Sequence, residues 1–294
     1  MPNGGEQVAR ETKAEGIGLG LRHALASELF AQTSSPVRWL ELHPENYLDR
    51  GGRYESMLTQ ARARFPLLTH GLTMAFGSIA PFDPSYLRDL RGLLADLQVP
   101  WHSDHLCFAG VDGVFAHDLL PLPWSRESVD VAVDRVRQAQ DALGVPIALE
   151  HISYYARAPG GEMSELAHLC EILERADAKL LLDVNNVFVN SQNHGFDPRA
   201  FIDGLPLARV VQLHVAGHLV RADGLRVDTH AEPVCEEVFA LFEYTMTKLG
   251  RRLPVLLERD DNYPALGELL REVQRLEEIY ERSLASVPAA RVAE

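Results

Sequence analysis

Eight short apolar runs along the chain have the length and composition of buried β-strands. They cover residues 16–21, 37–43, 66–70, 100–105, 146–150, 179–183, 210–214 and 254–258. Their hydrophobic residues are continuous rather than alternating, which is typical of strands that are covered on both faces. The runs therefore predict the parallel sheet of an α/β protein.

A segment with helical spacing of its apolar residues follows each run. These segments are 23–32, 53–65, 84–97, 125–144, 163–176, 198–205, 235–250 and 265–284. Ser125 and Ser128 at one helix start, with Gly144 at its end, are typical of helix termini. Eight alternations of strand and helix predict a single α/β domain, a (β/α)8 TIM barrel, over residues 16–284.

The connections of the predicted barrel differ in length. The longest ones, residues 105–124, 184–197 and 215–232, follow strands at the carboxyl end, where barrel enzymes carry their active-site loops. A polar leader over residues 1–15 is predicted to be disordered, and residues 285–294 are predicted to form a flexible tail.

Six of the eight strands, the third to the eighth, end in or run directly into a side chain that can bind a metal ion. These side chains are His70, His105, Glu150, Asp183, His214 and Glu258. The carboxyl ends of parallel barrel strands converge on one face, so we expect the six to point into one cavity. A doubly wound open sheet, the alternative fold, would usually scatter them between two edges.

Further donors lie in the loops. Asn186 comes three residues after Asp183, and Asp228 and His230 are two apart, which places both side chains on one side of an extended segment. Grouping by neighbouring strands predicts three ions, with Glu150 bridging the first two. The predicted groups are His70, His105 and Glu150; Glu150, Asp183, His214 and Glu258; and Asn186, Asp228 and His230.

Other polar residues have the positions of groups that orient metal ligands. Asp104 precedes His105, His218 follows His214, and Asp260 comes two residues after Glu258. Three further residues either line the pocket or form hydrogen bonds within a loop, and both roles are open. They are His43, Glu45 and Asn46 of the LHPENY segment. Nitrogen and oxygen donors without thiolates suit iron, manganese or zinc.

Composition narrows the function classes. Lys and Arg total 28 against 42 Asp and Glu, a formal charge of -14, and such a surface disfavours nucleic acid as a partner. No apolar stretch approaches the about 18 residues of a membrane span, and no secretion signal is present, so a cytoplasmic protein is expected. The three cysteines are scattered without CxxC spacing, which predicts neither disulfides nor a zinc knuckle.

The site residues also carry a recognisable series of motifs. In chain order these are LHPENY, LTHG, SDHL, HDLLPLP, LEH, LLDVNNVFVNSQNHGFDP, QLHVAGH and VDTH. From about residue 16 to 284 the chain resembles the multinuclear non-haem iron-dependent oxidative enzymes, which include the iron enzyme of methanobactin biosynthesis. The order of ligands is also similar to that of endonuclease IV and, more distantly, of xylose-isomerase-like barrels.

This resemblance implies a xylose-isomerase-like barrel that holds two or three iron ions of mixed Fe(II)/Fe(III) state at the positions grouped above. It implies O2 as co-substrate and a cysteine-containing, ribosomally made precursor peptide as substrate. A substrate thiolate would bind one iron while O2 is activated at another, with hydrogen abstraction from the cysteine Cβ. It also implies a separate partner protein that recognises the leader of the peptide.

Two positions depart from the family pattern. His151 and Ile152 stand where many relatives have Asn-Pro, and Arg259 precedes Asp260 where Trp is common. Arg259 is expected either to bind a peptide carboxylate at the pocket mouth or to face solvent.

Two other functions are compatible with the same residues. A zinc-dependent, endonuclease-IV-like phosphodiesterase would share the ligands, but the charge of -14 and Asn186 in place of a third-metal histidine count against it. A non-catalytic metal-binding protein that serves a partner is the other alternative.

Overall fold

A computed structural model describes residues 14–111 and 114–286 of the chain. The barrel strands are β1 (Gly16–Gly20), β2 (Leu40–Leu42), β3 (Leu67–Thr69), β4 (His102–His105), β7 (Ile147–Glu150), β8 (Lys179–Asp183), β9 (Val210–Val215) and β12 (Pro254–Leu257). The helices are α1 (His23–Ala31), α2 (Arg53–Arg62), α3 (Pro84–Leu97), α4 (Arg126–Leu143), α5 (Glu165–Arg175), α6 (Val184–His194), α7 (Pro198–Gly204), α8 (Glu236–Leu249) and α9 (Leu266–Ala285). Residues 1–13 of the predicted leader (1–15) and residues 287–294 of the predicted tail (285–294) lie outside the described residues. The end of the leader and the start of the tail were placed wrongly, because Ala14 is buried inside the barrel and Ala285 is the last residue of α9.

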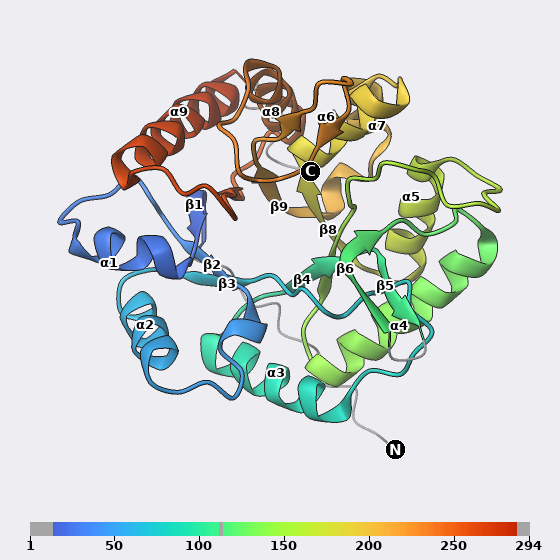
Figure 1. The fold of residues 1–294 in the computed structure, drawn as a ribbon, viewed down its shortest axis with the longest axis horizontal. Coiled ribbons are helices and arrows are strands. Elements are labelled where there is room, and N and C mark those ends of the chain that lie inside the picture. The colour runs from blue at the N-terminus through green and yellow to red at the C-terminus, as the bar shows by residue number, and fades with distance from the viewer. Residues whose placement is uncertain (1–13, 112–113, 287–294) are drawn as a thin grey trace.

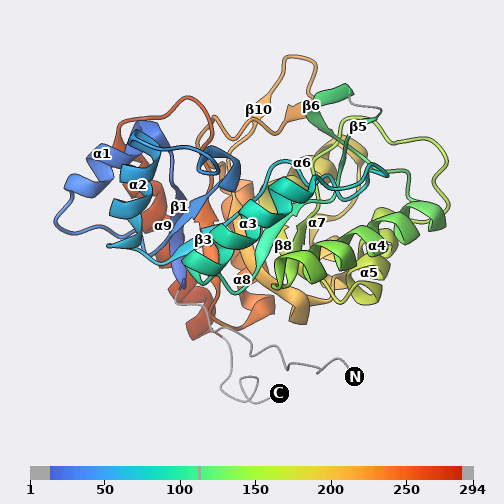
Figure 2. The ribbon, with the colours of Figure 1, turned by 90° about the horizontal axis from the view of Figure 1, so that it is seen from below.

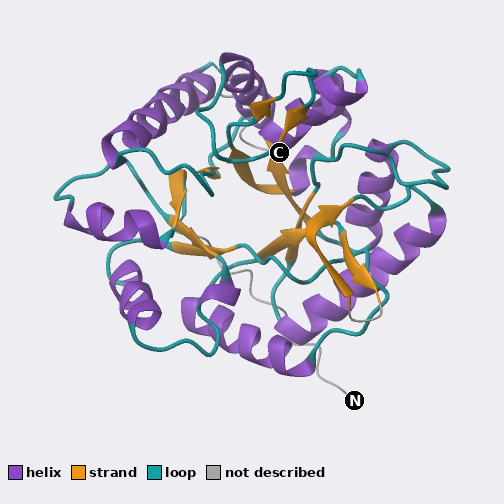
Figure 3. Ribbon diagram, viewed as in Figure 1, coloured by secondary structure: helices purple, strands orange, loops and turns teal. Residues whose placement is uncertain are grey.

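The eight barrel strands form one parallel sheet that curls into a ring, with the helices around it (Figures 1 and 3). The sheet order is β3-β2-β1-β12-β9-β8-β7-β4, so each strand neighbours the barrel strands before and after it in the chain. A parallel bridge between His70 and Ser103 joins β3 to β4, and the Gly71 amide donates to the Ser103 carbonyl at 2.6 Å. The predicted (β/α)8 barrel is confirmed.

Side chains inside the barrel come from alternate positions of each strand. One cluster of buried residues fills the interior, whereas the residues between them pack outward against the helices. The interior cluster consists of Ala14, Trp39, Leu68, Trp101, Ala148, Leu181 and Leu256. A strand step of two residues therefore keeps a side chain inside the barrel and moves it toward the carboxyl end.

Two antiparallel hairpins project from one end of the barrel (Figure 2). They are β5 (Phe108–Val111) with β6 (Val114–Leu120), and β10 (Leu219–Val220) with β11 (Arg226–Val227). Both interrupt connections that follow barrel strands, β4 and β9 respectively. The carboxyl end of the barrel is therefore the more elaborate one.

The prediction that residues 184–197 form a loop was wrong, because α6 begins directly after β8. The Asp183 carboxylate caps the helix by accepting from the Asn186 amide, and Gly195 ends it in the left-handed conformation with φ of 73°. Its Asn, Ser and His residues are weak helix formers, which hid the apolar spacing of Val184, Val187 and Phe188.

The other helices cover the barrel with one apolar face each. In α9, for example, Leu269, Val273 and Leu276 are fully buried. Within the described part of the chain, no helix is both long and apolar enough to cross a membrane.

We expect the substitution Gly18→Ala to destabilise the barrel. A Cβ at this position would lie 2.4 Å from Cε2 of Trp39, whose rigid indole is fully buried and donates from Nε1 to the Gly16 carbonyl at 2.9 Å. Overpacking of this kind lowers the free energy of unfolding by about 1–3 kcal/mol. Denaturant unfolding of the two proteins measures the difference.

Gly92→Ala in α3 is the matched control, because its Cβ would meet nothing within 4 Å. It should raise the free energy of unfolding by about 0.5–1 kcal/mol, since alanine is the better helix former. Equal stability of the two variants would contradict the described packing inside β1.

Candidate metal centre

The six strand-end side chains predicted from the sequence all point into the carboxyl end of the barrel. Four of the six come two positions after a residue of the interior cluster: His70 after Leu68, Glu150 after Ala148, Asp183 after Leu181 and Glu258 after Leu256. All six are buried, with at most 9% of any residue exposed. The interior of the barrel thus has two levels: a lower level of apolar side chains, and an upper level at the carboxyl end that holds imidazoles and carboxylates.

The first donor group joins β3, β4 and β7. Glu150 Oε2 lies 3.2 Å from His70 Nε2 and 3.6 Å from His105 Nε2, and the two imidazole nitrogens are 3.3 Å apart. The Ser103 hydroxyl donates to the Thr69 carbonyl, so it accepts from Nδ1–H of His70 at 3.0 Å. In that tautomer Nε2 of His70 carries no proton, and its lone pair faces Glu150 Oε2 and His105 Nε2.

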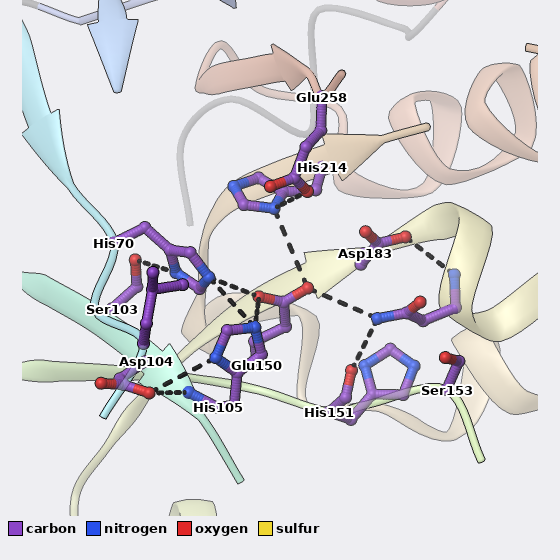
Figure 4. A network of polar contacts seen from close by, with 12 residues as sticks. His70, Ser103, Asp104, His105, Glu150, His151, Ser153, Asp183, His214 and Glu258 are labelled. Atoms are coloured by element: carbon purple, nitrogen blue, oxygen red, sulfur yellow. Dashed lines mark hydrogen bonds and ion pairs between the residues drawn. The ribbon is translucent and has the colours of Figure 1, made fainter. Parts of the chain in front are cut away.

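The other carboxylate oxygen of Glu150 faces a second group (Figure 4). Oε1 of Glu150 lies 3.8 Å from Nδ1 of His214. The same oxygen accepts a hydrogen bond from the side-chain Nδ2 of Asn186 at 3.4 Å. Glu150, Asp183 and His214 offer ligand atoms within 4.8 Å of one another. The two oxygens of one carboxylate thus face two different donor groups.

His214 is also close to the carboxylate that ends β12. Its Nδ1 lies 3.0 Å from Oε2 of Glu258, while its Nε2 lies 3.2 Å from Oε2 of Glu41. Because Glu41 accepts the Nε2 proton, Nδ1 is the atom of His214 available to a metal ion.

A third group forms where the segment after β11 crosses the barrel mouth. His230 Nε2 lies 2.9 Å from Oδ1 of Asp228, as their spacing of two predicted. His230 also shares a donor group with Asp183 and Glu258. Asn186, which was grouped with this pair, donates from its side-chain Nδ2 to Glu150 and to the His151 carbonyl, while its Oδ1 has no hydrogen-bond partner among the described residues.

Several polar atoms of these groups are buried and have no hydrogen-bond partner among the described residues. They are His105 Nδ1, Glu150 Oε2, Asp183 Oδ2, Asn186 Oδ1, His214 Nδ1 and His230 Nε2. Buried polar atoms are normally paired, and an unpaired one costs about 1–3 kcal/mol. Most of these atoms are of the types that iron, manganese or zinc bind, so the residues present fit a metal centre.

Crowding of buried acids and imidazoles shifts their ionisation. Burial, together with Asp183 and Glu258, raises the pKa of Glu150 to about 8 although His214 and His105 oppose it. Burial and the neighbouring Asp228 raise the pKa of Asp183 to about 6. At neutral pH the metal-free cluster therefore retains protons that a bound cation would replace.

The imidazoles respond to their carboxylate neighbours. Burial alone would lower the pKa of His105, but contacts with Asp104 and Glu150 raise it to about 9. For His214 burial likewise opposes the shift, and Glu41 and Glu258 raise its pKa well above the usual value.

The three predicted orienting residues lie at different distances from the ligands. Asp104 Oδ1 accepts from the His105 amide at 2.6 Å and lies 3.4 Å from its Nδ1. Asp260 Oδ2 lies 3.0 Å from His230 Nδ1. His218 contacts no predicted ligand directly; it bonds Asn185 at 2.8 Å.

Asn185 completes that indirect connection. Its amide donates to Asp228 Oδ1 at 2.6 Å, and the Ser153 hydroxyl donates to the other oxygen of Asp228 at 3.1 Å. Neither residue was predicted from the sequence.

Glu41 and Arg22 were also missed. Glu41 is fully buried on β2, and Arg22 Nη2 lies 2.6 Å from Asp260 and 3.7 Å from Glu258. A carboxylate inside the apolar run WLELH was the available signal for Glu41. No local pattern distinguishes Arg22 from a surface arginine.

Both expectations for Arg259 were wrong. It is 4% exposed, donates to the Ala231 carbonyl at 2.9 Å and pairs with Glu272 at 2.9 Å. Because Glu258 points inward, the next residue of the strand points outward, away from the pocket.

The three residues of the LHPENY motif differ from one another. His43 donates from Nδ1 to the His70 carbonyl at 2.9 Å, and Glu45 accepts from the Leu72 amide and the Tyr86 hydroxyl. Asn46 is exposed. The motif therefore holds the connections after β2 and β3 in place.

Comparison with curated proteins gives relatives that match nearly the whole chain. A UPF0276 protein of Pseudomonas aeruginosa is 44% identical over 268 residues, covering 91% of this chain and 93% of the relative. A UPF0276 protein of Shewanella oneidensis is 39% identical over 260 residues, covering 88% and 92%.

Solved structures share the fold at low sequence identity. A xylose isomerase domain protein from Alicyclobacillus acidocaldarius has a TM-score of 0.56 at 19% identity, covering 92% of this chain and 98% of that one. D-Psicose 3-epimerase from Clostridium cellulolyticum has a TM-score of 0.55 at 12% identity, covering 92% and 97%. The barrel is thus of the xylose-isomerase-like type.

The family model of the RiPP precursor modification enzymes MbnB/TglH/ChrH matches residues 16–281. The match spans the whole barrel, including every donor residue described above. This chain therefore belongs to that family, the multinuclear non-haem iron-dependent oxidative enzymes that its motifs resemble.

Proposed function

We propose that this protein is an O2-dependent enzyme with two or three iron ions that oxidatively modifies cysteine residues of a ribosomally made precursor peptide. The observation that carries the proposal is the Glu150 carboxylate, whose two oxygens face two buried donor groups. A carboxylate in this arrangement can bridge two ions about 3.5–4 Å apart, the separation at which two metals act on one bound group. Family membership supports a peptide as the substrate.

The donor set would divide among three ions. His70, His105 and Glu150 would hold the first, and Glu150, Asp183 and His214 the second. His230 with Asp183, Asp228 and Glu258 would hold the third, with Asn186 oriented toward Glu150. Bound iron would supply one-electron redox chemistry and open positions for a thiolate and O2.

Neighbouring side chains of the protein would hold the metal ligands in position. Glu41 and Gln212 hold His214 from behind, and Ser103 fixes the tautomer of His70. Partners of this kind are worth about 10–100-fold in metal affinity.

The protein's cysteines would leave the metal to the substrate thiol. Cys107 is buried near Asp104 and Glu150, and burial raises the pKa of its thiol well above the usual value. A neutral thiol is a poor metal ligand.

A polypeptide partner is supported by the apolar surface around the barrel mouth. The large hydrophobic side chains that are exposed in the described part of the chain all lie between a barrel strand and its following helix. They are Leu72, Ile79, Leu120, Tyr155, Leu219 and Val220. Exposed apolar side chains on the connections at this end of the barrel favour binding of a peptide or of a leader-binding partner protein there.

The proposal predicts iron-dependent oxidation of a peptide. Protein purified without oxygen should contain two or three iron ions per chain by elemental analysis. With O2 it should change the mass of a cysteine-containing peptide encoded beside its gene, and a Cys→Ser peptide should stay unchanged. Stoichiometric zinc and no iron-dependent product would refute the proposal, and cleavage of an abasic DNA site would favour the phosphodiesterase.

Glu150→Gln should disrupt the first two ions together, because the amide removes one charge and one bridging oxygen. We expect product formation to fall by more than the about 10–100-fold typical of losing a ligand's partner. Glu165→Gln is the matched control: Glu165 accepts from the Tyr154 hydroxyl at 3.0 Å and belongs to none of the donor groups. Loss of only one ion in Glu150→Gln would contradict the bridge.

Metal binding should tighten as the pH rises toward 8. The pKa of Glu150 is raised to about 8, so below that pH its proton must leave before the carboxylate binds a cation. Each displaced proton changes the apparent affinity by up to about tenfold per pH unit. Calorimetric titration in buffers of different ionisation enthalpy counts these protons; an affinity independent of pH between 6 and 8 would contradict the prediction.

A further inference from the structure

Arg22 is a buried arginine at the edge of the metal centre that belongs to none of the predicted groups. It follows β1, at the N-cap of α1, and is 9% exposed. The neighbouring Gly20 makes room for it: a Cβ there would lie 2.7 Å from Arg22 Nη1 and 2.8 Å from its Cζ. The end of β1 is therefore shaped around this guanidinium group.

The guanidinium holds Asp260 with two nitrogens. Nε and Nη2 of Arg22 donate to the same oxygen of Asp260 at 3.1 and 2.6 Å. The other Asp260 oxygen accepts from His230 Nδ1–H at 3.0 Å. Arg22 thus fixes the carboxylate that sets the tautomer of His230 and leaves the Nε2 lone pair of His230 for a metal ion.

The segment that carries His230 needs such an anchor. His230 has a left-handed backbone with φ of 49°, which costs a residue other than glycine about 1 kcal/mol or more. Its carbonyl accepts from the Asp260 amide at 3.0 Å. Two residues earlier, Asp228 accepts hydrogen bonds from Asn185 and Ser153.

We propose that Arg22 is a positioning residue for the third metal ion, acting through Asp260 on His230. The proposal rests on the proposed function only in taking His230 as a metal ligand. Arg22 contacts neither His70 nor His105, so the first ion should not depend on it. Removing the guanidinium should therefore weaken one metal position and spare the first.

The test is anaerobic titration of the metal-free protein with Co²⁺, followed by visible absorption and by cobalt bound per chain. Arg22→Met should weaken the third equivalent by about 10–100-fold and leave the first unchanged. Arg22→Lys, which keeps the charge but not the paired donors, should restore part of the loss.

Gly20→Ala tests the same point without altering any polar side chain. The three atoms nearest to its Cβ all belong to the flexible end of Arg22, so the barrel should fold while the guanidinium is displaced. Gly92→Ala, whose Cβ meets nothing within 4 Å, is the control and should bind cobalt like the wild type.

The selective loss of the third equivalent in both Arg22→Met and Gly20→Ala would support the proposal. An unchanged third equivalent, an even loss of all equivalents, or a wild-type protein that binds no third cobalt would overturn it. The peptide assay remains independent: a protein that shows the selective loss but oxidises no peptide would contradict the proposed function alone.

Discussion

The structure depends on how a group of buried carboxylates is neutralised. Glu41, Glu150, Asp183 and Glu258 share one end of the barrel with at most 4% of any of them exposed. Isolated charges in such surroundings are costly, and buried acids are normally paired or bind metal ions. Arg22 and the imidazoles supply part of the positive charge that balances these acids. When no cation is bound, a proton on Glu150 removes the negative charge of that carboxylate. Cations at the donor groups would satisfy the remaining atoms.

The barrel explains why these acids can be brought together at all. Its apolar lower level, which contains Trp39, Leu68 and Trp101, carries the packing, and the outer faces of the strands pack on the helices. The upper level is thereby free to hold polar side chains that contribute little to the core. A strand step of two residues converts one level into the other, so the same backbone supports both packing and chemistry.

Sequence patterns predicted the features that follow from this periodicity. The eight strands, the ring and the convergence of the strand-end donors all follow from residues that are close in sequence. The same alternation makes Arg259 point outward, because its neighbour Glu258 points inward. The three-residue spacing of Asp183 and Asn186 also reflects helix capping, because the Asp183 carboxylate accepts from the backbone amide of Asn186 at the start of α6.

Contacts between distant segments could not be predicted in this way. Arg22 and Asp260 are 238 residues apart, and Glu41 and His214 are 173 apart. Such pairs form only once the ring closes β1 against β12, and nothing near Arg22 in the sequence marks it. The candidate metal ligands could be predicted from the strand ends, whereas the residues that would orient them required the three-dimensional structure.

Anomalous diffraction from crystals of the anaerobically prepared protein, recorded at the iron edge, tests the bridging role of Glu150 most directly. If Glu150 bridges two ions, two iron peaks should lie about 3.5–4 Å apart, one on each side of its carboxylate. The first peak should contact His70 and His105, and the second should contact His214. A single peak, or iron that does not contact both Glu150 oxygens, would contradict that bridging role.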